Sequence, residues 1–257
     1  MKCPLIIIFI FVSLKSFAQI GGNNTFEFLN LPFSARTAAL GGNLICVKDD
    51  DLNQSFQNPS LLNEKMHNKM SLTYINYIAD VNYGYAAYAR SYDSIGNFSV
   101  GMQFLDYGKF QRAEQNGDII GRFFANEYAL NMSYSRDIDT LFSVGGTLKT
   151  IYSLFETYWS IGNTVDIAGT YYNSKQLFTA AVVVKNLGYQ WKPYVKGSVR
   201  EPMPFEVQLG ISKKVQKAPF RLGLILTHLE KWDLTFVDPV LAQQSVDPIT
   251  GEAIKTS

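Results

Sequence analysis

The sequence has little cysteine and histidine, which limits the ways in which the chain can be cross-linked or can hold a metal. Its 257 residues include two cysteines, Cys3 and Cys46, and two histidines, His67 and His228. Cys3 lies in an N-terminal stretch that we expect to be removed, so Cys46 has no partner for an intramolecular disulfide. Because these ligands are few and far apart in sequence, we expect no metal and no other cofactor.

Charge and recognisable reaction motifs are also scarce. Charged residues make up 18% of the chain, against roughly a quarter in an ordinary soluble domain. Removal of Lys2 and Lys15 with the N-terminal stretch lowers the basic count from 23 to 21 against 22 acidic residues, a net charge of −1. A nucleic-acid-binding face normally needs a basic excess, so nucleic acid is not an expected partner. Since no nucleophile elbow, phosphate-binding glycine loop or dinucleotide fingerprint occurs, we expect no enzyme activity.

Long hydrophobic runs are missing after the N-terminus. The longest dense one is Leu177–Val184, far short of the about 20 residues of a membrane-spanning helix. The N-terminus itself combines a positively charged start with the apolar core Leu5–Leu14 and the small-x-small sequence Ser16–Ala18. We therefore predict that residues 1–18 are a secretory signal peptide and that the mature chain begins at Gln19.

Aromatic residues, by contrast, are abundant and lie in regularly spaced segments. They form 14% of the chain, with 15 Tyr and 18 Phe. After residue 69 the chain repeats segments of about ten residues, rich in aromatic and β-branched residues and separated by turn-forming residues. This pattern predicts nine strands: Met70–Ile78, Val81–Arg90, Asn97–Asp106, Glu127–Arg136, Leu141–Tyr152, Asn163–Tyr172, Gln176–Leu187, Pro204–Lys213 and Pro219–His228.

Most of these segments have one apolar face and one small or polar face. In Glu127–Arg136, for example, Leu130 and Met132 oppose Asn131 and Ser133. Such alternation suits a soluble sandwich with its apolar face inward, or a membrane barrel with its apolar face toward lipid. The length of the segments and the Gly, Ser, Ala, Asn and Gln of the second face favour the membrane barrel. So do aromatic residues near strand ends, where interfacial girdles lie: Tyr74, Tyr77, Phe124, Tyr152, Tyr171 and Tyr172.

The strand count implies that the barrel is incomplete. Bacterial outer-membrane barrels are closed and have an even number of strands, because an open edge leaves backbone groups unpaired in lipid. The chain ends in the polar stretch Asp247–Ser257 rather than in an amphipathic strand. We therefore expect residues 70–257 to form an antiparallel transmembrane β-barrel that lacks its C-terminal strands, unless merged loops have distorted the count.

Residues 19–69 differ from the strand region and form an expected plug or periplasmic segment. The sequence from Leu31 to Leu40 predicts a short helix with Ser34 as its N-cap, stopped by Gly41 and Gly42. Further on, Asn58 and Pro59 either shape a functional plug or end a loop, because proline restricts the residue before it.

The charged residues of this segment also have two interpretations each. Arg36 either pairs with a carboxylate inside the barrel, such as Asp166 or Glu127, or lies at the surface. The acidic run Asp49–Asp51 offers oxygen ligands for calcium, but it lacks the Gly and Glu of a known calcium loop and is more typical of a solvated turn.

Several short motifs resemble those of a known family, the FadL-like outer-membrane barrels. The similarity is strongest to the PorV/PorQ branch, which belongs to the type IX secretion system of Bacteroidetes. It extends over the mature chain in degenerate stretches: Phe26–Leu29, Leu31–Gly42, Asp49–Asp51, Asn58–Ser60, Thr164–Ala168, Val184–Gly188 and His228–Leu234.

The resemblance implies that the mature chain lies in the outer membrane, and it also implies a fold and a role. The fold would be a FadL-like barrel whose lumen is lined or plugged by the N-terminal segment. The role would be to anchor or assemble the cell-surface complex that attaches secreted cargo, with outer-membrane lipid and other attachment-complex proteins as partners. Two alternatives stay open: a channel for hydrophobic small molecules, and a soluble exported β-sandwich that acts as a binding module.

Overall fold

The computed structural model describes residues 24–231. The predicted signal peptide, Cys3, the polar tail Asp247–Ser257 and the end of the His228–Leu234 motif lie outside the described residues. All nine predicted strands are confirmed: β1 Met70–Asn76, β2 Asn82–Tyr92, β3 Gly96–Ala113, β4 Ile119–Asp137, β5 Phe142–Phe155, β6 Tyr158–Asn173, β7 Phe178–Lys192, β8 Glu206–Lys214 and β9 Arg221–Leu226.

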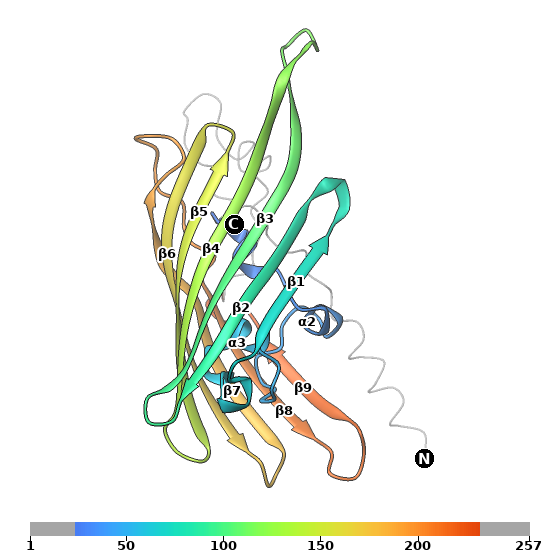
Figure 1. The fold of residues 1–257 in the computed structure, drawn as a ribbon, viewed down its shortest axis with the longest axis vertical. Coiled ribbons are helices and arrows are strands. Elements are labelled where there is room, and N and C mark those ends of the chain that lie inside the picture. The colour runs from blue at the N-terminus through green and yellow to red at the C-terminus, as the bar shows by residue number, and fades with distance from the viewer. Residues whose placement is uncertain (1–23, 232–257) are drawn as a thin grey trace, which may run out of the picture.

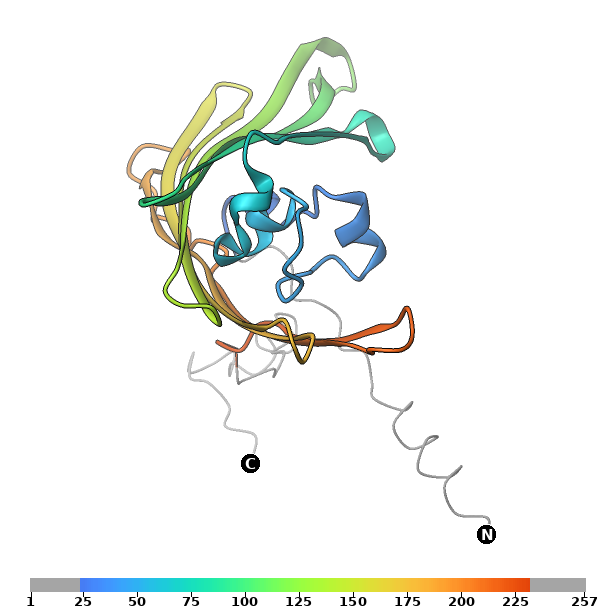
Figure 2. The ribbon, with the colours of Figure 1, turned by 60° about the horizontal axis from the view of Figure 1, so that its bottom comes forward.

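The strands form one antiparallel sheet in which each strand pairs with the next along the chain (Figure 1). The predicted all-β, antiparallel fold is thus confirmed. The sheet curls strongly, and Figure 2 shows β1 and β9 as its two edges. No pairing joins β1 to β9, so within residues 24–231 the sheet is open and the expected barrel, which we predicted to be incomplete, is not confirmed.

The two ends of the sheet differ in their connections. At one end, which we call the turn end, β2–β3, β4–β5, β6–β7 and β8–β9 are joined by short turns. At the other end, the loop end, residues 193–205 form the longest connection, and the β3–β4 hairpin rises beyond the other strands (Figure 1). β3 and β4 reach further than predicted because the turn-like residues after Asp106 also pair, across a bulge between Asp106 and Lys109.

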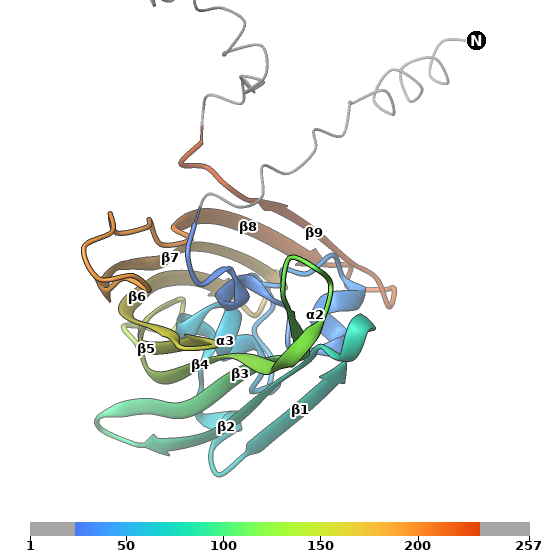
Figure 3. The ribbon, with the colours of Figure 1, turned by 90° about the horizontal axis from the view of Figure 1, so that it is seen from above.

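The N-terminal segment, residues 24–69, lies inside the curl of the sheet (Figures 2 and 3). Its helical turns are short: η1 Glu27–Asn30, α2 Ala35–Ala39, α3 Gln54–Gln57, η2 Pro59–Leu61 and η3 Glu64–Met66; a further turn, η4 Ile78–Asp80, joins β1 to β2. Turns of this length are not stable alone and depend on tertiary packing.

Aromatic packing fixes this segment to β2. The Phe33 ring lies 5.2 Å from the Phe56 ring and 5.5 Å from that of Tyr83, centroid to centroid. Tyr85 lies 5.3 Å from Phe56. The inner face of β2 is therefore the apolar one, which differs from the outward apolar face expected for a strand of a membrane barrel. The reason is that the N-terminal segment buries its own apolar side chains there.

On β3–β8 the polarity is largely the reverse of that in a soluble domain. The inner face carries buried polar side chains: Gln103, Asn131, Ser133, Thr147, Lys149, Ser153, Thr164, Asp166, Thr179 and Gln208. The outer face carries large apolar side chains that are exposed: Val100, Met102, Leu130, Met132, Val144, Leu148, Ile167, Val182, Leu209 and Ile211. Such a continuous exposed apolar surface marks a contact with lipid or with another protein.

Candidate functional site

The helix α2 begins and ends as the sequence predicts. The Ser34 hydroxyl accepts a hydrogen bond from the Thr37 amide at 3.4 Å and caps the first turn. Gly41 and Gly42 both have positive φ, and the Gly42 amide donates to the Thr37 carbonyl while the Gly41 amide donates to that of Ala38. These two bonds form a Schellman motif, which needs the left-handed backbone that glycine adopts most easily.

Arg36 pairs with neither carboxylate suggested from the sequence. Its guanidinium lies 2.6 Å from Asp49 and 3.4 Å from Asp51, at a half-exposed position. Although partial burial opposes the charged form, hydrogen bonds to these carboxylates and their negative charge raise the pKa of Arg36. The expectation of a partner in Asp166 or Glu127 is therefore wrong, because the acidic run lies closer to α2 than the strands do.

The acidic run is compensated by cations of the same segment. Asp50 forms an ion pair with Lys69, and this hydrogen bond and the charge of Lys69 lower the pKa of Asp50. The carboxylates of Asp49, Asp50 and Asp51 are thus paired with Arg36 or Lys69. Within residues 24–231, no three His, Cys, Asp or Glu side chains are arranged to hold a metal ion.

Asn58, Pro59 and Ser60 dock directly on the sheet. The Asn58 amide donates to the Ile45 carbonyl at 2.7 Å and to the Thr170 hydroxyl at 3.0 Å, while its oxygen accepts from the Ser60 amide and hydroxyl. Ser143 of β5 donates to the Ser60 carbonyl at 2.8 Å. Both Asn58 and Ser60 are fully buried. The motif therefore holds residues 58–60 of the N-terminal segment against the inner face of β5 and β6.

A glycine on β5, Gly145, allows the N-terminal segment to come this close to the sheet. A Cβ built on Gly145 would lie 2.6 Å from both the Pro59 carbonyl carbon and the Ser60 nitrogen, closer than real contacts allow. The backbone of the N-terminal segment therefore lies directly against the backbone of β5.

Replacing this glycine is expected to displace the segment. Gly145→Val should cost about 1–3 kcal/mol of stability by overpacking and should raise the rate of tryptic cleavage at Lys48, measured by limited proteolysis of the folded protein. Gly169→Val is the control, because no atom lies within 4 Å of a Cβ there. Equal cleavage rates in the two variants would contradict the role of Gly145.

A second contact is a buried charge cluster, which we define as Lys149, Asp166, Lys185, Asn186 and Glu206. It originates in a β-bulge. Val165 pairs with Leu187 and Ile167 pairs with Val184, so two residues of β7, Lys185 and Asn186, lie opposite the single residue Asp166 of β6. Lys185 and Asn186 are both buried on the inner side of the sheet.

The bulge brings the cluster into hydrogen-bonding distance. The Lys149 ammonium lies 2.7 Å from an Asp166 carboxylate oxygen and donates to the Asn186 side chain at 2.9 Å. The other Asp166 oxygen accepts from the Asn186 amide at 2.8 Å. Lys185 and Glu206 are register partners on β7 and β8. Two cations and two carboxylates therefore balance, which is the condition for burying charge at all.

The cluster also holds the N-terminal segment. Lys185 donates to the Gln57 side chain of α3 at 2.9 Å, and Asn186 donates to Asn30 of η1 at 3.1 Å. The Lys149 ammonium lies 5.6 Å from the centre of the Phe56 ring, a cation–π contact. Asp166, Lys185 and Asn186 lie in two of the motifs that carry the family resemblance, Thr164–Ala168 and Val184–Gly188, but no sequence pattern indicated that they meet Lys149 and Glu206.

The buried amide of Asn58 gives a direct test of the docking. Asn58→Ala leaves the Ile45 carbonyl without its donor and the Ser60 backbone amide without its acceptor, and each buried unpaired group costs about 1–3 kcal/mol. The free energy of unfolding, from denaturant titration followed by tryptophan fluorescence, should fall by at least that amount. Asn116→Ala, in the exposed tip of the β3–β4 hairpin, is expected to change it little, and a loss as large as in Asn58→Ala would contradict the assignment.

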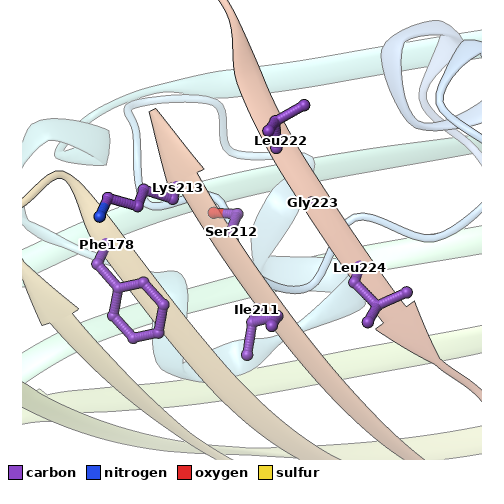
Figure 4. A pocket seen from close by; sticks show the side chains of 7 residues that line it. All are labelled: Phe178, Ile211, Ser212, Lys213, Leu222, Gly223 and Leu224. Atoms are coloured by element: carbon purple, nitrogen blue, oxygen red, sulfur yellow. The ribbon is translucent and has the colours of Figure 1, made fainter. Parts of the chain in front are cut away.

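A surface depression lies on the side of the sheet away from the N-terminal segment. It is a shallow depression of about 210 Å³ on the outer face near the turn end, between β7, β8 and β9 (Figure 4). Its lining is Phe178, Ile211, Ser212, Lys213, Leu222, Gly223 and Leu224.

Comparisons with known proteins give this chain no family. A scan against protein-family models and a search of curated proteins each found no match. In the described part of the chain, no helix is both long and apolar enough to cross a membrane.

Proposed function

We propose that this chain is an outer-membrane protein of the PorV/PorQ type, in which β1–β9 form part of a transmembrane barrel wall and residues 24–69 plug its lumen. The observation that carries the proposal is the reversed polarity of the sheet. Apolar side chains such as Leu130 and Met132 are exposed on the outside, and polar ones such as Asn131 and Ser133 are buried inside. This is the arrangement of an outer-membrane strand and costs free energy in water.

The open edges support the same proposal. In lipid, the free backbone groups of β1 and β9 would be costly, so further strands must pair with them to close the wall. We assign the turn end to the periplasmic side and the loop end to the cell surface, because outer-membrane barrels have short periplasmic turns and longer outer loops.

A role in anchoring follows from the filled interior and from the sequence resemblance. Within residues 24–231 the inner face is bonded to the N-terminal segment through Asn58, Lys185 and Asn186, which favours a fixed plug over an open route for substrates. The proposed task is to hold the type IX cargo-attachment complex on the outer membrane through the protruding loops. The channel alternative predicts that deletion of the gene reduces uptake of a labelled hydrophobic compound.

The experiment is fractionation of cells that express the full chain, followed by extraction in mild detergent and identification of co-purifying proteins by mass spectrometry. We expect the chain in the outer-membrane fraction together with surface secretion components. Recovery from the aqueous fraction without detergent would instead support a soluble sandwich, and recovery as an isolated membrane protein would support the channel.

A pair of shortened variants tests whether the β3–β4 hairpin contacts the secretion components. Removing the exposed tip of the β3–β4 hairpin, residues 113–119, shortens a loop that lies beyond the wall. The shortened chain is expected to reach the membrane but to lose the secretion components. Shortening the β2–β3 turn at the opposite end should leave co-purification unchanged, and loss in both variants would point to misfolding.

A further inference from the structure

The outer-face depression between β7, β8 and β9 has an apolar lining and one cation. Phe178, Lys213 and Leu222 are register partners across the three strands and form one row. In the next row, Ala180 is the register partner of Ile211, and its small side chain leaves room on the surface beside Phe178. Figure 4 shows the Lys213 side chain running toward Phe178.

Lys213 has no counter-ion among residues 24–231. Lys213 forms no ion pair with any residue between 24 and 231, nor do Lys175, Lys214 and Lys217 at the same end of the sheet. These four side chains are all exposed. The sequence has no acidic residue between Asp166 and Glu201, and none between Glu206 and Glu230. Within residues 24–231, the turn end of β7–β9 therefore carries a concentration of exposed lysines that form no ion pair.

An apolar surface depression next to such cations is complementary to one class of ligand. An acyl chain fits against Phe178, Ile211 and Leu224, and a phosphate accepts charge-assisted hydrogen bonds from the lysines. Lys213 can lie along the apolar surface with its stem and present its ammonium at the edge of the membrane. Basic groups at this depth are a known means of lipid headgroup recognition.

We propose that this depression and the lysines around it bind an anionic glycerophospholipid of the periplasmic leaflet, with an acyl chain in the depression and the phosphate at Lys213. The inference rests on the proposed function, since it requires the outer face to lie in a membrane with the turn end toward the periplasm. Strands that close the wall next to β9 extend the sheet sideways, so they leave this outer surface free.

The test uses the full chain purified in detergent and native mass spectrometry with added phosphatidylglycerol, phosphatidylcholine or lipid A. We expect retention of phosphatidylglycerol, with phosphatidylcholine and lipid A retained less. Lys213→Gln should weaken the retention by about tenfold, the effect of losing one charged hydrogen bond. Ile211→Trp, which fills the depression, should also reduce it.

Lys196→Gln is the matched control, because Lys196 is an exposed lysine in the connection at the opposite end of the sheet. Equal retention by the Lys213→Gln and Lys196→Gln variants, equal retention of phosphatidylglycerol and phosphatidylcholine, or a preference for lipid A would overturn the proposal. Flotation of each variant with lipid vesicles tests the proposed membrane location separately from the lipid-binding inference. A protein that floats but does not select the lipid contradicts this inference alone, whereas one that does not float contradicts the proposed function.

Discussion

Asp166→Asn is expected to lower the free energy of unfolding by about 3–5 kcal/mol, because removal of one partner leaves a buried charge uncompensated. Lys149 is 2% exposed and Asp166 is 0% exposed, so water cannot replace the missing carboxylate. Lys149→Met should lower the free energy of unfolding by a similar amount, since it leaves the buried Asp166 carboxylate without its cation. The measurement is denaturant-induced unfolding of the detergent-folded protein, followed by tryptophan fluorescence.

The double variant Lys149→Met, Asp166→Asn separates burial of charge from loss of shape. Replacing both members of a buried pair by uncharged groups is often close to neutral, so the double variant should be more stable than either single one. Glu156→Gln, at the half-exposed pair with Arg112, should change stability by less than about 1 kcal/mol. If the single and double variants lose the same free energy, the ion pair does not hold the segment as described.

Leu130→Arg is expected to destabilise the membrane-inserted protein by about 2–4 kcal/mol, the cost of a cation on the lipid-facing side near the middle of a barrel wall. Leu130 is 40% exposed and lies on the outer face of β4. In water the same change would be neutral or favourable, because it would remove an exposed apolar side chain. Folding into vesicles of defined lipid, titrated with urea, measures the difference.

Ile119→Arg serves as the control for this experiment. Ile119 is 61% exposed and begins the same strand, but it lies in the part of the β3–β4 hairpin that rises beyond the other strands. We expect the variant to match the unaltered protein. A Leu130→Arg variant that is as stable as the Ile119→Arg variant would indicate that the outer face lies in water or against another protein.

The two sets of variants examine different parts of one arrangement. The Asp166 and Lys149 variants probe the inner face, where β5, β6 and β7 hold α3 and η1 through polar groups. The Leu130 variant probes the outer face, which the proposal assigns to lipid. A stable wall needs both contacts, because its polar inner face is covered by the N-terminal segment and its apolar outer face has to be removed from water.

The sequence by itself determined the strands and the ends of α2. Period-two alternation is a local property, and so is the capping of α2 by Ser34 and its termination by Gly41 and Gly42, since each involves residues a few positions apart. The same locality explains the errors at strand ends. The pairing that extends β3 and β4 beyond Asp106 depends on the partner strand rather than on the residues' own preferences.

Only the tertiary structure decided which groups meet. The partners of Arg36, the inward direction of the apolar face of β2 and the bulge that joins Lys185 and Asn186 to Asp166 all depend on contacts between residues distant in the sequence. Alternation states that a strand has two faces, but not which of them the N-terminal segment will cover. That choice is made by packing, because the segment buries Phe33 and Phe56 against β2 and bonds its polar side chains to β5, β6 and β7.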